Sequence, residues 1–229
     1  QWVALPGHKG SEILANDIPA FVMSMPLTEM VSLTAGFSRL QDASENDGFE
    51  YNDDNDLAFL TVPVSAEMFN VTPFLAYNWN GGNSGTTSTA GVKSTDKSDT
   101  IWAGFSGSAN FDPINVMFDF NYGDKDDDDV EANDASGWYG YLGVDYKMDM
   151  MTPELFFFYG SGDDDDLSDG HETMPRTGFQ DHWLSGFVFD AATFASDFDS
   201  YMAWNVAGMW GIGLNLKGIQ FMDKLTHNF

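Results

Sequence analysis

Residues 114–122 read INVMFDFNY, and apolar and polar side chains alternate along this stretch. Successive side chains of a β-strand point to opposite sides, so the alternation predicts a strand with two different faces. The apolar face carries Ile114, Val116, Phe118, Phe120 and Tyr122. The opposite face is mostly polar and carries Asn115, Met117, Asp119 and Asn121.

The same two-faced pattern recurs along the chain, and helical periodicity is nearly absent. Because this period is that of a half-buried strand, we expect an all-β protein. The pattern is clear at 31–39, 100–109 and 209–217, and it indicates further strands near 20–25, 57–65, 71–79, 138–147 and 153–160.

The connections between these strands alternate between short and long. Short ones fall near 26–30, 66–70, 110–113, 148–152 and 218–222, and long ones near 6–19, 40–56, 80–99, 123–137 and 161–206. Strands of about ten residues with short turns at one end and long polar loops at the other are typical of membrane barrels. The pattern therefore predicts a transmembrane antiparallel up-and-down β-barrel.

Aromatic residues gather at the predicted strand ends, at Tyr77, Trp79, Tyr122, Trp138, Tyr139 and Tyr159. Amphipathic rings prefer the level of the lipid headgroups, although aromatic residues also favour strands in general. We interpret these residues as an interfacial girdle.

Residues 1–229 are expected to form one barrel segment of about eleven strands, with residues 1–5 ending a strand that enters a long loop. Single-chain bacterial barrels have an even number of strands, and an open edge in lipid leaves backbone groups unpaired. We therefore expect this sequence to be a fragment of a longer barrel. The alternation before Phe229 is poor, so this residue is not favoured as the end of a closing strand.

The charge of the chain is strongly acidic and segregated. The sequence holds 36 acidic and 9 basic residues, for a net charge of -27, together with 15% aromatic residues. A disordered acidic chain lacks such aromatics, and a surface this negative repels nucleic-acid phosphates. We thus expect an ordered protein without DNA or RNA partners.

Three segments resemble the outer-membrane homotrimeric porins of sulfate-reducing bacteria: QWVALP (1–6), FVMSMPLTEMVSLTAGFSRLQD (21–42) and KGIQFMDKLTHNF (217–229). The resemblance implies a trimeric, water-filled barrel of about sixteen strands in a bacterial outer membrane. It also implies passive diffusion of small hydrophilic solutes, and a substrate-specific channel is an alternative within the same architecture.

In such a channel the working residues are those that face the lumen. A lumen that holds carboxylates raises the local cation concentration, so we expect a weak cation preference. The alternation predicts as pore-lining residues Ser32, Thr34, Asn78, Thr100, Asn115, Asp119, Asn121, Asp145, Lys147, Asn215 and Lys217.

Two runs of aspartate in the predicted loops have the ligand density that Ca²⁺ requires, without the spacing of an EF-hand. They comprise Asp126, Asp127, Asp128, Asp129, Asp163, Asp164, Asp165 and Asp166. One interpretation is a solvated, self-repelling loop. The other is Ca²⁺ that bridges loops or the phosphates of lipopolysaccharide, and no other cofactor is expected.

Nothing in the sequence points to an enzyme. Cysteine is absent, and the histidines His8, His171, His182 and His227 lie in predicted loops or near the end of the chain without a catalytic motif. The long segment 161–206 mixes aromatic residues with Asp, which fits an inward-folding loop, a subunit contact or simple loop packing. The alternative fold is a soluble, acidic β-sandwich that binds Ca²⁺ or carbohydrate, in which the apolar faces meet in a core.

Overall fold

In the computed structural model, every element with assigned bounds is a β-strand. No helix of the described part of the chain is long and apolar enough to cross a bilayer. The structure describes residues 1–42, 54–81, 97–128, 133–163, 170–178, 181–182, 208–222 and 225–227.

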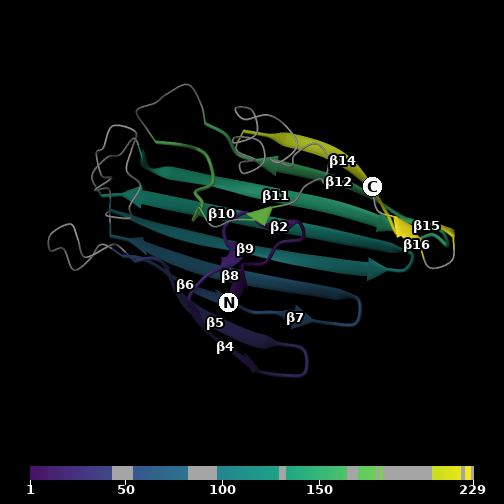
Figure 1. The fold of residues 1–229 in the computed structure, drawn as a ribbon, viewed down its shortest axis with the longest axis horizontal. Helices are drawn as coiled ribbons and strands as arrows, with labels where there is room; N and C mark the ends of the chain where they lie inside the picture. Colours follow the sequence, from purple (N-terminus) through teal and green to yellow (C-terminus); the bar gives the residue numbers. More distant parts are fainter. Residues whose placement is uncertain are drawn as a thin grey trace.

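Ten strands form one antiparallel sheet, in which chain neighbours are also neighbours in space (Figure 1). Its order is β14-β12-β11-β10-β9-β8-β6-β5-β4, with the short β7 paired to β8. This confirms the prediction of an all-β, antiparallel, up-and-down fold. The strands are β4 (Ala20–Pro26), β5 (Ser32–Gln41), β6 (Asn55–Thr61), β7 (Val64–Ser65), β8 (Phe69–Asn80), β9 (Ser98–Phe111), β10 (Ile114–Asp127), β11 (Ala135–Tyr146), β12 (Thr152–Gly160) and β14 (Trp210–Lys217).

Each of the strands predicted between residues 20 and 217 is present. The one predicted at 57–65 is interrupted between β6 and β7, around Pro63. Proline has no N–H to donate to a neighbouring strand, which explains the break. Short connections, such as the one between β9 and β10, alternate with long ones, such as the one between β10 and β11.

The register keeps the alternating side chains of adjacent strands on common faces. Along β10, Phe120 pairs with Phe105 of β9 and with Gly140 of β11, while Asp119 pairs with Ser106 and Tyr141. Each strand therefore continues the two faces of the strand before it.

We call one side of the sheet the exposed face. Its large apolar side chains are accessible to solvent: Phe21 is 72% exposed, Ile212 67% and Leu142 48%. The face extends over the whole sheet and includes Phe21, Met23, Phe37, Leu60, Leu75, Trp79, Ile101, Phe105, Ile114, Phe120, Tyr122, Trp138, Leu142, Val144, Leu155, Phe157, Trp210, Ile212 and Leu214.

Rings of the predicted girdle lie on the exposed side, where Trp138 stacks on Tyr159 with ring centroids 4.5 Å apart and Tyr77 meets Trp79 edge-on. Tyr139 is an exception, because it is 2% exposed and lies on the opposite face. Adjacent strand residues point to opposite sides, so Trp138 and Tyr139 cannot both face outward.

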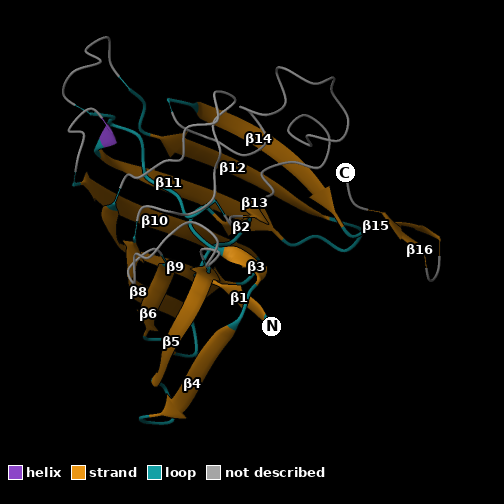
Figure 2. Ribbon diagram, turned by 60° about the vertical axis from the view of Figure 1, so that its left-hand side comes forward, coloured by secondary structure: helices purple, strands orange, loops and turns teal. Residues whose placement is uncertain are grey.

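The opposite side, which we call the covered face, is overlain by the first eighteen residues. These form β1 (Trp2–Ala4), β2 (Gly10–Ser11) and β3 (Ala15–Asp17), and the sheet curves around them (Figure 2). β1 pairs with β3, and β2 with β13 (Asp181–His182). We call residues 1–18 the N-terminal segment.

Burial of apolar side chains explains the position of the N-terminal segment. Ile13 and Leu14 are 0% exposed and belong to one core with rings of the covered face such as Phe74 and Phe158. Fully burying one such side chain contributes about 1.5–3 kcal/mol. Residues 1–5 are thus not the end of a strand of the main sheet, and residues 6–18 are not a loop beyond it, as the sequence pattern had suggested.

Large rings fit on the covered face because they lie over glycines of neighbouring strands. A Cβ built on Gly36 would lie 2.2 Å from the ring of Phe59, and one on Gly213 would lie 2.2 Å from the ring of Phe156. A side chain at these positions would occupy the volume of the ring, so glycine is needed for the ring to pack against the sheet.

The sheet is open in the described residues. β4 and β14 each have one neighbour, and β15 (Ile219–Met222) pairs only with β16 (Leu225–His227). Closure into a barrel and the total strand number therefore stay predictions. Phe229 lies outside the described residues.

Candidate functional site

Ten of the eleven predicted pore-lining residues lie in strands of the main sheet, on the covered face. They are Ser32 and Thr34 in β5, Asn78 in β8, Thr100 in β9, Asn115, Asp119 and Asn121 in β10, Asp145 in β11, and Asn215 and Lys217 in β14. Lys147 follows the end of β11 and is exposed in the turn. Because the N-terminal segment covers part of this face, Asp119 and Asn121 are buried.

Near the β14 edge of the covered face, at the start of β12, lies a buried carboxylate, Glu154, whose side chain is 0% exposed. Lys9 Nζ lies 2.7 Å from Oε1, and Lys217 Nζ lies 2.8 Å from Oε2. The Tyr141 hydroxyl donates a hydrogen bond to Oε1, and Asn215 Nδ2 donates to Oε2 over 3.2 Å. A buried carboxylate is tolerated when it is paired and hydrogen-bonded in this way.

Lys217 links this carboxylate to a second one. Its Nζ lies 2.9 Å from Asp145 Oδ1, and its side chain is 37% exposed, against 16% for Asp145. Strand pairing brings these two carboxylates together, since Glu154 is opposite both Asp145 and Asn215. We call Lys9, Tyr141, Asp145, Glu154, Asn215 and Lys217 the Glu154 cluster.

Three members of the Glu154 cluster, Asp145, Asn215 and Lys217, were predicted as pore-lining residues. Glu154 was missed because it opens the otherwise apolar stretch ELFFFY (154–159). The available signal was alternation, which places Glu154 on the face opposite Leu155 and Phe157. Lys9 was missed because it lies outside any predicted strand.

A second contact fixes the N-terminal segment to β10. Asp119 accepts a hydrogen bond from the backbone N–H of His8 over 2.9 Å, and its Oδ1 lies 2.7 Å from His8 Nδ1. Ser106 Oγ lies 3.1 Å from the same nitrogen. A serine–histidine–carboxylate triad uses the two ring nitrogens separately, so this arrangement holds the segment and does not build a triad.

Residues 170–178 also lie on the covered face, and they bind both the sheet and the N-terminal segment. Trp102 Nε1 donates to the carbonyl of Pro175 over 2.7 Å, and Arg176 Nη2 lies 2.6 Å from Glu12 Oε2. The Thr177 hydroxyl donates to the carbonyl of Ile13. This part of the loop after β12 thus folds inward, whereas residues 183–206 lie outside the described residues.

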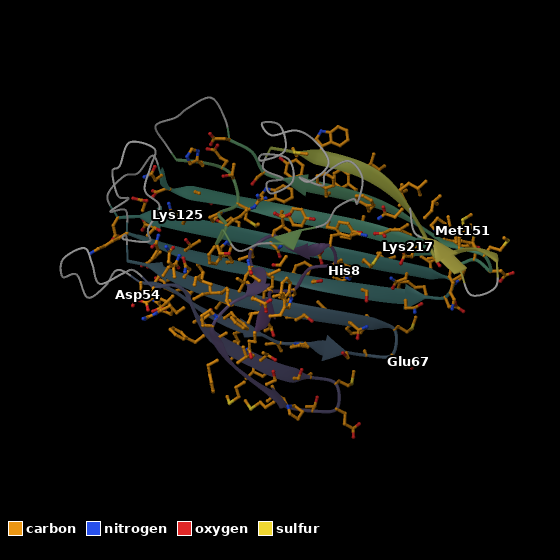
Figure 3. The ribbon with its side chains drawn as sticks, viewed as in Figure 1. His8, Asp54, Glu67, Lys125, Met151 and Lys217 are labelled. Carbon is orange, nitrogen blue, oxygen red and sulfur yellow. The ribbon has the colours of Figure 1, made fainter. Side chains whose placement is uncertain are left out.

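The labelled side chains lie at different positions along the sheet (Figure 3). Asp54 and Lys125 lie toward the end of the long connections, Lys217, Glu67 and Met151 lie toward the short turns, and His8 lies between the two ends. At the long-loop end Arg39 bridges Asp54 and Asp56 at 2.8 and 2.9 Å. Partial withdrawal from water raises the pKa of Asp54, and Arg39 opposes this shift.

The aspartate runs are only partly covered by the structure. Asp127 Oδ2 forms an ion pair with Lys125 Nζ at 3.3 Å, and Asp163 Oδ1 lies 3.2 Å from His171 Nδ1. Asp129, Asp164, Asp165 and Asp166 lie outside the described residues. No group of three or more acidic or histidine side chains suited to hold a metal is present where the structure describes the chain, and Ca²⁺ binding stays a prediction.

The covered face therefore combines polar residues with two inward segments. Ion pairs and hydrogen bonds hold these segments to the sheet and to each other. Such a surface can line an aqueous path and sort ions by charge. Neither a protein-family model nor a curated protein sequence matches this chain.

Proposed function

We propose that this chain forms part of a porin-type channel in a bacterial outer membrane, through which small hydrophilic solutes and ions diffuse passively. The observation that carries the proposal is the opposition of two faces across the main sheet. One face exposes large apolar side chains on almost every strand, and the other carries buried polar and charged residues together with the rings of the core.

A lipid bilayer is the environment that suits the exposed face. An apolar patch of this extent is rare on soluble monomers, and strands that cross a bilayer need about 9–11 residues. The central strands β8 to β11 have 12, 14, 14 and 12 residues, which is long enough to cross with tilt. The aromatic rings on the exposed side fit the interfacial level.

The covered face is the proposed wall of the water-filled lumen. Asp119, Asp145 and Glu154 give this wall more carboxylates than the two lysines of the Glu154 cluster balance. A net negative wall concentrates cations, so we propose a weak cation preference. The N-terminal segment and residues 170–178 narrow the path.

The open sheet supports closure by further strands, and the resemblance supports a trimer. A sheet in lipid must close, because unpaired backbone groups at its edges are costly there. We propose that strands beyond those described close the barrel between β4 and β14. We also propose a homotrimer, with the acidic loops meeting lipopolysaccharide through bridging divalent cations.

The soluble β-sandwich is disfavoured by the exposed face. In a sandwich the apolar faces of two sheets meet in a core, whereas here Phe21, Trp210 and Ile212 remain 72%, 68% and 67% exposed. Nothing among the described residues favours binding of carbohydrate or Ca²⁺ by a sandwich over the channel.

Planar-bilayer recording tests the proposal. The protein, purified in detergent, is expected to insert and to give stable conductance steps, in groups of three for a trimer. A salt gradient is expected to give a reversal potential of the sign for cation preference. A protein that stays monodisperse without detergent and never conducts contradicts the channel, while anion preference contradicts only the sign of selectivity.

A further inference from the structure

The cation closest to the buried Glu154 is supplied by the N-terminal segment and not by the wall. Lys9 Nζ lies 2.7 Å from Oε1 and 2.9 Å from Oε2 of this carboxylate. It also lies 5.5 Å from the centre of the Phe156 ring and 5.9 Å from that of Tyr141. The side chain is 16% exposed, so the ammonium group is held in a fixed place.

Around Glu154, the residues of the sheet carry more negative than positive charge. Lys217 is shared between Asp145 and Glu154, which leaves one negative charge in excess among these three residues. Lys9 cancels that excess, so the Glu154 cluster is neutral with the segment in place. The segment thus changes both the width of the lumen and its charge.

We propose that Lys9 is a specificity-determining residue, which lowers the cation preference of the channel by neutralising Glu154. The inference rests on the proposed function, because it assigns a role within the lumen of that channel. It makes the ion preference a property of the inward segment and of the wall together.

The expected size of the effect follows from electrostatics. A unit charge within a Debye length, about 10 Å at 0.1 M salt, acts on ions in a narrow aqueous path. Removing one positive charge is expected to raise the cation-to-anion permeability ratio about threefold at that salt concentration. At 1 M salt the Debye length falls to about 3 Å, and most of the change is expected to disappear.

Two opposite variants separate charge from displacement of the segment. Lys9→Met and Glu154→Gln break the same ion pair, so a loosened segment changes conductance in the same direction in both. The charge, in contrast, changes in opposite directions. We expect Lys9→Met to raise the cation-to-anion permeability ratio and Glu154→Gln to lower it, each measured from reversal potentials in planar bilayers.

Two control variants test whether the change in permeability ratio depends on the charge of residue 9 and on its position. Lys9→Arg is expected to keep the wild-type ratio, and Arg39→Met, which removes a positive charge paired to Asp56 on the exposed face, is expected to leave it unchanged. Should Glu154→Gln fail to insert, Asp145→Asn provides the same loss of negative charge on the wall and is expected to lower the ratio.

The result that overturns the inference is a ratio that moves in the same direction in Lys9→Met and in the acidic variants, or does not move. A shift of undiminished size at 1 M salt also contradicts it. Salt screens the effect of a charge, but it does not alter the effect of a change in pore width. These outcomes leave the channel itself intact, since they require wild-type conductance. An absence of wild-type conductance contradicts the proposed function instead.

Discussion

At the scale of single residues, the covered face depends on glycines that lie beneath aromatic rings. A Cβ on Gly213 would lie 2.2 Å from the ring of Phe156, which is 3% exposed and stacks on Tyr141. The ring cannot move without disturbing the Glu154 cluster, because Lys9 and Tyr141 contact it. Overpacking of this kind costs about 1–3 kcal/mol.

We therefore expect Gly213→Ala to lower the free energy of unfolding by about 1–3 kcal/mol. Gly140→Ala is the matched control, since a Cβ there meets nothing closer than 3.7 Å and points to a hollow of about 360 Å³ lined by Trp138 and Leu142. Urea titration in detergent, followed by circular dichroism, measures both. Equal midpoints for the two variants contradict the ring-over-glycine account.

Pairing of buried charges gives a second prediction at this scale. Glu12 is 2% exposed and pairs with Arg176 across two inward segments, and breaking a buried pair typically costs about 3–5 kcal/mol. Arg176→Met is expected to free residues 1–18 and 170–178 for limited proteolysis while the sheet stays resistant. The double variant Glu12→Gln/Arg176→Met also removes the negative charge that Arg176 compensates, and it is expected to restore part of the resistance. The same cleavage in both variants contradicts this.

At the scale of the element, substitutions in strand β10 test whether the exposed face contacts lipid or water. Phe120 lies near the middle of β10 on the exposed face, and Ile114 begins the strand at the short turn. In a barrel, Arg at the bilayer midplane costs about 2–4 kcal/mol, and near the interface about 0–1 kcal/mol. We expect Phe120→Arg to destabilise the protein in lipid vesicles much more than Ile114→Arg.

The same pair of variants also addresses the soluble alternative. If the exposed face meets water, Phe120→Arg loses only the ring contacts with Phe105 and Trp138 and places the new charge in solvent. The substitution is then expected to cost little stability and to improve solubility. Unfolding in vesicles and in detergent-free buffer, measured on both variants, decides between the two environments. Equal stability of Phe120→Arg and Ile114→Arg in vesicles contradicts a lipid-facing β10.

Strands could be predicted from the sequence because alternation is a local property. INVMFDFNY already placed Asp119 and Asn121 opposite Phe120, and the register then repeated those faces across the sheet. The contact between Lys9 and Glu154 could not be predicted, because tertiary packing brings together residues that are far apart in the chain. The position of the N-terminal segment was missed for the same reason, since Val3, Ile13 and Leu14 do not form a continuous pattern.

At the scale of the whole molecule, charge opposes compactness. The net charge is -27, and like charges held together repel one another. The described part of the chain relieves some of this repulsion through pairs such as Lys125 with Asp127. With 9 basic residues for 36 acidic ones, most carboxylates must be balanced by ions from solution.

Two kinds of counterion can provide this balance, and they differ in a measurable way. Sodium screens diffusely, and raising its concentration from about 10 to 150 mM shortens the Debye length from about 30 to 8 Å, so the melting temperature is expected to rise. Calcium bound by the aspartate runs is expected to raise it further at equal ionic strength, and a chelator to reverse that gain. The control replaces Asp163, Asp164, Asp165 and Asp166 with Asn, which should remove the part of the calcium increment that this run contributes and keep the sodium effect. Identical melting temperatures in sodium and calcium at matched ionic strength would mean that the acidic loops are only screened and hold no bound ion.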